Sequence, residues 1–250
     1  MLGEEAVNYR ETLAKQLIGL ESCYVLDAGT GAGTMTRVLS ANLKASIVSV
    51  DRNRRLFSDI QDKVDRSKVD FVACDFTCLP FIDSAFRGTI CDLVLSTTTN
   101  LNVSQVLTEF RRTLGAKSTV YVTDYYPEER PRHKPDRQAA ATWKLHREVL
   151  EHKGITREET PPKLITQLLY KAGFHNARCE RMAANEELEW KTRVFAEYYS
   201  GVKYLISTLN SPEARRTLRN KLEEIKDEIE VHGKPVNWNW GANYLILASA

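Results

Sequence analysis

The sequence has no long uncharged apolar run. A membrane-spanning helix needs about 18 or more consecutive apolar residues, and polar or charged residues interrupt every apolar stretch of this 250-residue chain before that length. The first ten residues are charged and lack the apolar core of a secretion signal. We therefore expect a cytoplasmic protein without a membrane span.

An excess of charge of one sign is also missing. The 35 lysines and arginines nearly balance the 33 aspartates and glutamates, which leaves a formal net charge of +2. Recognition of nucleic acid usually needs a strong basic excess or a clustered basic face, so the composition does not favour a nucleic-acid partner. One basic rim for RNA or protein stays open as an alternative, formed by Arg111, Arg112, Lys117, Arg130, Arg132, Lys134 and Arg137.

The five cysteines follow no metal-binding spacing. Their number is odd, and no pair of Cys-x-x-Cys motifs occurs among Cys23, Cys74, Cys78, Cys91 and Cys179. Structural zinc sites use such paired motifs, so we predict no metal site. Reduced, buried thiols of a cytosolic protein explain the cysteines better.

The chain does contain an alternation of short apolar runs with amphipathic stretches. Apolar residues make up 42%, an ordinary share for a soluble domain with a packed core. Strands are predicted at 23–26, 47–50, 69–73, 91–95, 119–123, 176–182 and 243–249. Helices are predicted at 4–20, 34–43, 56–64, 103–114, 138–153, 160–171, 186–209 and 212–231. This order predicts an α/β fold with a mostly parallel sheet that is covered on both faces.

Two segments are longer than ordinary connections within a domain. Residues 127–157 and 184–236 carry helical patterns, so we predict one domain over residues 1–250 with helical lid or cap insertions at these two places. Aromatic side chains gather in and after the second insertion. They suit a lid over an apolar or aromatic substrate, and equally a homodimer interface or ordinary core; they are Trp190, Phe195, Tyr198, Tyr199, Tyr204, Trp238 and Trp240.

A glycine-rich turn follows the first predicted strand. It reads Asp27-Ala28-Gly29-Thr30-Gly31-Ala32-Gly33. Ligands of open α/β sheets bind beyond the carboxyl ends of the strands, and glycines let a ligand approach the backbone closely. A dinucleotide fingerprint has the spacing G-x-G-x-x-G, whereas the third glycine here comes one residue early. The acid Asp27 suits a ligand with a positive ammonium group better than a pyrophosphate.

The pattern D-x-G-x-G-x-G after a strand resembles motif I of the class I, Rossmann-like S-adenosylmethionine-dependent methyltransferases. The likeness covers residues 22–124 and fades to an α/β pattern over 160–182 and 242–250. Gly115-Ala116 stands where the family usually has two glycines. Further segments resemble the small-molecule subfamily that includes quinone-biosynthesis enzymes, namely Leu79-Pro80-Phe81 with Asp83, Ser84 and Phe86, then Cys91-Asp92-Leu93-Val94, and Glu109 to Leu114.

This resemblance implies a seven-stranded, mostly parallel, doubly wound sheet with an antiparallel last strand. It also implies S-adenosylmethionine as cofactor, with S-adenosylhomocysteine as product. In the family the glycine turn contacts the methionine part, the acid after strand two binds the ribose, and the residues after strand three contact the adenine. The predicted cofactor-binding residues are Asp27, Gly29, Thr30, Gly31, Gly33, Asp51, Arg52, Asp75, Phe76 and Ser96. Taken singly, Asp51 and Asp75 also fit solvated turn residues.

Methyl transfer from a sulfonium is an in-line displacement, so the enzyme must align the nucleophile and exclude water. A general base is needed only where the nucleophile carries a proton of high pKa. His146 is the candidate base and Tyr125 the candidate substrate contact, with packing as the alternative role of both. The Asn/Asp-Pro-Pro-Tyr motif of many nucleic-acid and glutamine methyltransferases is absent at 96–100.

The leading prediction is therefore methyl transfer to a small-molecule acceptor. A methyltransferase that acts on RNA or protein is the first alternative, and salt-dependent RNA binding would favour it. A non-catalytic cofactor-binding protein of the same fold is the second, because binding of the cofactor does not establish turnover.

Overall fold

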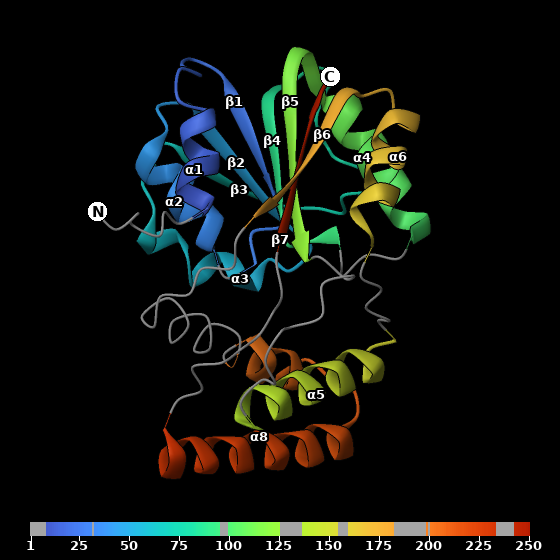
Figure 1. Ribbon diagram of the computed structural model, residues 1–250. Helices are drawn as coiled ribbons and strands as arrows, with labels where there is room; N and C mark the ends of the chain where they lie inside the picture. Colours follow the sequence, from blue (N-terminus) through green and yellow to red (C-terminus); the bar gives the residue numbers. More distant parts are fainter. Residues whose placement is uncertain are drawn as a thin grey trace, which may run out of the picture. The chain divides into compact units, whose positions relative to one another are not determined.

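The computed structural model describes residues 9–31, 33–95, 100–125, 137–154, 160–182, 199, 201–233 and 243–250 (Figure 1). The chain divides into two units. The first, called the sheet unit, holds residues 1–128, 158–183 and 242–250, and the second, called the helical unit, holds residues 129–157 and 184–241. The bounds of the helical unit are close to those of the two predicted insertions. Its action as a lid stays a prediction.

Seven strands form one sheet in the sheet unit (Figure 1). Their order is β3-β2-β1-β4-β5-β7-β6. The strand β7 runs antiparallel to both its neighbours, and the other pairs are parallel, which confirms the predicted fold class. The strands are β1 (Tyr24–Ala28), β2 (Ser46–Asp51), β3 (Val69–Ala73), β4 (Phe86–Asp92), β5 (Leu114–Tyr125), β6 (His175–Met182) and β7 (Asn243–Ser249).

The strand order reverses between β1 and β4. From β1 the chain moves outward through β2 and β3, and it then returns to β4 on the other side of β1. Ligands of open α/β sheets bind at such a reversal, beyond the carboxyl ends of the strands. The glycine turn follows β1 directly, so the topology places it at this point.

Helices cover both faces of the sheet (Figure 1). On one face, apolar side chains of α1 (Tyr9–Gln16) and α2 (Thr34–Asn42) pack with Val25 of β1. On the other, side chains of α4 (Asn100–Thr113) and α6 (Pro162–Lys171) pack with Leu26. Successive strand residues point to opposite faces, and this is why β1 reads as a continuous apolar run.

The predicted strand 91–95 is wrong in its position. The strand β4 begins five residues earlier, at Phe86, and ends at Asp92. Gly88 resembles a loop residue in the sequence, yet it lies inside the strand. A Cβ at Gly88 would lie 3.0 Å from the Cδ2 atom of Leu17, so the missing side chain makes room for the apolar residues that follow α1.

Two predicted helices are too long. The stretch 56–64 is an α-helix only over α3 (Arg55–Ser58), with a 3-10 turn at Gln61–Lys63, because Ile60 turns inward and is 2% exposed. The stretch 4–20 ends its helix at Gln16, since Gly19 adopts a left-handed conformation with φ 104°. Residues 4–8 lie outside the described part of the chain.

The helical unit has its own apolar core. It contains α5 (Arg137–His152), helical residues 201–207 and α8 (Pro212–His232), while most of the predicted helix 186–209 lies outside the described residues. The hydroxyl of Ser211 accepts a hydrogen bond from the N–H of Ala214 at 3.2 Å and caps α8. The core includes Leu145, Val149, Val202, Ile206, Leu218 and Leu222. Within the described residues, no helix has the length and hydropathy to cross a bilayer.

Candidate functional site

The three glycines of the turn have different surroundings. All adopt left-handed conformations, with φ 99° at Gly29, 49° at Gly31 and 76° at Gly33, and such conformations favour glycine. A Cβ at Gly29 would lie 2.2 Å from Val94, and one at Gly33 would lie 2.6 Å from Ile60. At Gly31 the nearest atom would be 3.9 Å away. Gly29 and Gly33 therefore serve packing, whereas Gly31 leaves its side of the turn open to a ligand.

A buried polar network surrounds Asp27, which is 1% exposed. Its Oδ2 atom accepts hydrogen bonds from the hydroxyls of Thr36 at 2.6 Å and Ser49 at 2.8 Å, and the Thr30 hydroxyl lies 2.7 Å from that of Ser49. The other carboxylate oxygen, Oδ1, is buried and has no partner among the described residues. Burial raises the pKa of Asp27 to about 6, against the lowering effect of the two hydroxyls. A cationic ligand group at Oδ1 would satisfy this oxygen and favour its charge.

The acid predicted to bind the ribose is tied directly to the turn. Asp51 ends β2, and its Oδ2 atom accepts a hydrogen bond from the N–H of Gly31 at 3.0 Å. Its Oδ1 atom accepts one from the N–H of Asn53 at 2.9 Å. Two backbone donors thus orient the carboxylate beside the open glycine, and each oxygen has a further lone pair for a ligand hydroxyl.

The acid predicted to bind the adenine is paired with Arg52. Asp75 follows β3, and its Oδ1 atom accepts from the N–H and the hydroxyl of Thr77 at 2.8 and 2.7 Å. The guanidinium of Arg52 donates to Oδ2 at 2.8 and 3.1 Å. The Thr77 hydrogen bonds, helped by Arg52, lower the pKa of Asp75, so this carboxylate is an ionised acceptor at neutral pH.

The contacts around Asp92 were not predicted, although Asp92 lies in the segment Cys91 to Val94 that resembles the family. Asp92 ends β4 at the same edge of the sheet as the glycine turn. Its carboxylate accepts from the Tyr9 hydroxyl at 2.9 Å, from Arg10 Nε at 2.6 Å and from the Thr123 hydroxyl. The side chains of Arg10 and Asp92 are only 11% and 6% exposed. Arg10 precedes Asp92 by 82 positions. No local sequence pattern therefore predicts this contact, which holds α1 at the carboxyl edge of the sheet.

The structure describes some of the remaining predicted residues and not others. Phe76 is partly buried against the core of the sheet unit, and His146 is half-buried in α5 of the helical unit. Only the backbone of Tyr125 is described, at the end of β5, and Ser96 lies outside the described residues. The contacts of these four residues with cofactor or substrate stay predictions.

The residues present fit S-adenosylmethionine. This molecule carries a cationic ammonium group, two ribose hydroxyls and an adenine amino group. Asp27 would hold the ammonium side through Oδ1, Asp51 the ribose and Asp75 the adenine, with Gly31 open to the approaching ligand. When bound, the cofactor supplies a methyl carbon that a nucleophile can attack. No three His, Cys, Asp or Glu side chains in the described ranges are placed to share a metal ion.

Comparison with known proteins agrees with this fit. Residues 25–117 match the family model described as "Methyltransferase domain". A search of curated proteins finds no significant match to the sequence. The quinone-biosynthesis-like subfamily therefore stays a prediction.

The fold is similar to that of several solved structures. The [4+2]-cyclase SpnF is 14% identical with a TM-score of 0.61, over 99% of this chain and 85% of that chain. Geranyl diphosphate C-methyltransferase from Streptomyces coelicolor A3(2), crystallised with S-adenosyl-L-homocysteine, is 11% identical with a TM-score of 0.55, over 96% and 76%. Phosphoethanolamine N-methyltransferase 2 from Haemonchus contortus, crystallised with S-adenosyl-L-methionine, is 15% identical with a TM-score of 0.55, over 96% and 52%. Residues 25–117 thus match a methyltransferase domain, and the chain shares its seven-stranded fold with these solved structures.

Proposed function

We propose that the protein transfers the methyl group of S-adenosylmethionine to a small-molecule acceptor. The acidic carboxyl edge of the sheet carries this proposal. Asp27, Asp92 and Asp124 lie at the ends of β1, β4 and β5, where Asp27 and Asp124 are 1% and 2% exposed. Burial, together with the field of these three acids, raises the pKa of the Cys91 thiol. These buried acids offer no cation to a phosphate group of RNA.

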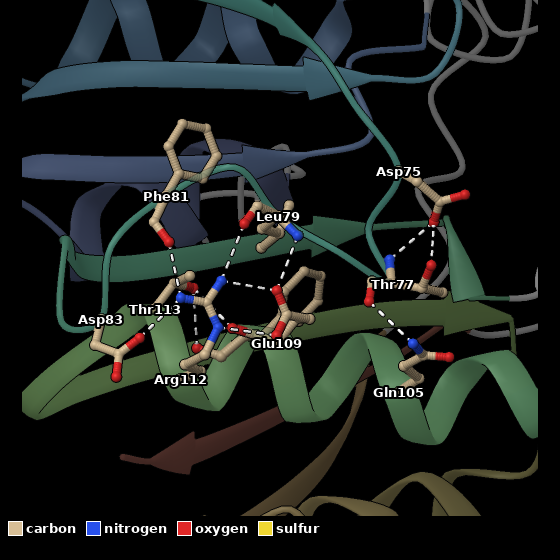
Figure 2. A network of polar contacts seen from close by, with 10 residues as sticks. Asp75, Thr77, Leu79, Phe81, Asp83, Gln105, Glu109, Arg112 and Thr113 are labelled. Atoms are coloured by element: carbon tan, nitrogen blue, oxygen red, sulfur yellow. Dashed lines mark hydrogen bonds and ion pairs between the residues drawn. The ribbon is translucent and has the colours of Figure 1, made fainter.

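In the sheet unit, the residues of the basic rim make other contacts or lie far from the glycine turn. Arg112 is held by an internal network (Figure 2), and Arg111 donates to the carbonyl oxygen of Gly173 at 3.1 Å. Lys117 lies near the start of β5, seven positions before Asp124, which is roughly 20 Å along a strand. These residues lie at the opposite edge of the sheet from the glycine turn, so they support no RNA site beside the methyl donor.

Two of the similar structures are named for small acceptors, geranyl diphosphate and phosphoethanolamine, which supports the same acceptor class. In this proposal Asp27, Asp51 and Asp75 bind the donor at three points and fix the direction of its methyl group. Alignment of the acceptor with the methyl group and exclusion of water supply most of the rate enhancement. His146 as general base, Tyr125 as substrate contact and the helical unit as a lid belong to the proposal.

Label transfer tests the acceptor class. Purified protein is incubated with methyl-tritiated S-adenosylmethionine and a cell extract separated into metabolite, RNA and protein fractions. We expect label in the metabolite fraction and none above the level of the Gly31→Val variant in the other two. Label in RNA or protein would overturn the small-molecule proposal. Binding of S-adenosylhomocysteine without label in any fraction would favour the non-catalytic alternative, which matters because a cyclase shares this fold.

Replacement of Asp51 by alanine should weaken binding of S-adenosylhomocysteine roughly tenfold, because the ribose hydroxyls lose their acceptor and the turn loses one tether. Calorimetry measures the dissociation constant. The matched control is Asp59→Ala, which removes an exposed aspartate of the same unit and should leave affinity unchanged. Equal affinities of the two variants would contradict the ribose role of Asp51.

A further inference from the structure

The connection from β3 to β4 contains no helix. It spans residues 74–85, and its second residue is Asp75, the acid that faces the adenine in the cofactor assignment. A crossover between parallel strands usually contains a helix that packs on the sheet. A connection without one needs another support if Asp75 is to keep a defined position.

We propose that three polar side chains of α4 supply this support and are positioning residues for the adenine end of the cofactor. They are Gln105, Glu109 and Arg112, here called the α4 clamp. Their spacing of four and three places them on one face of the helix. The inference rests on the cofactor assignment and is independent of the acceptor.

Arg112 makes most of the contacts of the clamp (Figure 2). Its Nη1 atom donates to the carbonyl oxygen of Phe81 at 2.7 Å and to the carboxylate of Asp83 at 2.8 Å. Its Nη2 atom donates to the carbonyl oxygen of Leu79 at 3.0 Å. The carbonyl oxygen of Arg112 accepts a hydrogen bond from the N–H of Ser84 at 3.0 Å. One residue therefore holds four positions of the connection.

Glu109 orients Arg112 and binds the connection itself. Its carboxylate accepts from Arg112 Nε at 2.9 Å and Nη2 at 2.8 Å, and from the N–H of Leu79 at 2.8 Å. The hydrogen bond from Arg112 lowers the pKa of Glu109, so the pair stays charged at neutral pH. The two side chains are 16% and 31% exposed, and such a bidentate, half-buried pair is geometrically specific.

Gln105 extends the clamp to Thr77, which contacts Asp75. Its Nε2 atom donates to the carbonyl oxygen of Thr77 at 3.1 Å, and Thr77 in turn donates twice to Asp75. Figure 2 shows two groups of contacts, one around Arg112 and Glu109 and one from Gln105 through Thr77 to Asp75; the backbone of the connection joins them. Loss of Arg112 would leave the carbonyl groups of Leu79 and Phe81 without their donor and loosen the segment that carries Asp75.

The test compares Arg112→Met with Arg111→Met in the full-length protein. Methionine keeps an apolar stem but no guanidinium. Arg111 is the neighbouring arginine of the same helix, and its hydrogen bond goes to Gly173 in another segment. We expect Arg112→Met to bind S-adenosylhomocysteine and adenosine roughly tenfold more weakly, equivalent to about 1.4 kcal/mol. The amides of Thr77 and Leu79 should also exchange hydrogen faster. The Arg111→Met variant should show neither change.

Native affinity in Arg112→Met, or an equal loss in Arg111→Met, would overturn the proposal. Arg112→Lys should recover part of the affinity, because a lysine keeps the charge and some of the donors. If Arg112→Met fails to fold, Gln105→Ala decides, since Gln105 is exposed and should still weaken adenosine binding a few fold. Native adenosine affinity in Gln105→Ala would then sink the idea. None of these measurements involves the methyl acceptor, so an unidentified or different acceptor leaves their outcome unaffected.

Discussion

The Gly31→Val variant should fold and yet bind S-adenosylhomocysteine at least about 100-fold more weakly, a loss of ~2.7 kcal/mol. An added Cβ meets no atom closer than 3.9 Å, so we expect the sheet unit to accommodate the variant. The added side chain would, however, project into the side of the turn that the ligand must approach. Calorimetry at a temperature well below unfolding measures the affinity, and circular dichroism verifies the fold.

The matched control is Gly154→Val. Gly154 also has a left-handed backbone, with φ 68°, and no atom within 4 Å of its added Cβ. Both variants pay a similar backbone strain, on the order of 1–2 kcal/mol, but only Gly31 lies in the candidate site. Similar affinities for the two variants would show that strain, and not blockage of a ligand, explains the effect. The Gly29→Val variant should instead unfold the turn, because its Cβ would lie 2.2 Å from Val94.

The ligand-free protein should lose about 3 kcal/mol of stability through Asp27 as the pH rises from 4 to 7. Burial raises the pKa of this carboxyl from 3.8 to about 6 in the folded state. Between these two values the folded protein keeps a proton that the unfolded chain has released. The stabilising contribution is therefore fully present below pH 4 and is lost as the pH passes 6.

Urea unfolding of the native protein and of Asp27→Asn at several pH values isolates this contribution. The amide keeps an acceptor for the hydroxyls of Thr36 and Ser49 but does not titrate. The difference in unfolding free energy between the two proteins should therefore change by about 3 kcal/mol across this range. The exposed Asp59→Asn variant serves as control and should show a constant difference. Parallel curves for Asp27→Asn and the native protein would contradict a buried, titrating Asp27.

The alternation of strands and helices follows from local sequence patterns, and so does the place of the glycine turn. Apolar periodicity reports which segments can bury one face, and the parallel order follows from strand–helix alternation. The acids Asp51 and Asp75 were found as candidates because each lies within two residues of the end of a predicted strand, and their binding roles stay predictions. The two largest errors, at β4 and at helix 56–64, have a common cause. The start of β4 depends on Gly88, which packs against Leu17, and the end of α3 depends on Ile60, which packs against Gly33. In both cases the two residues are distant in the chain.

By itself, the sequence determined the α/β class and placed the glycine turn, Asp27 to Gly33, after the first strand. Only the tertiary structure decided which glycine leaves room for the proposed ligand, since an added Cβ would meet Val94 at Gly29 and Ile60 at Gly33. The Asp92 anchor and the α4 clamp also emerged only in three dimensions. Their partners are separated by dozens of positions, and hydrogen bonds depend on atoms being within about 3 Å, a relation that no local pattern encodes.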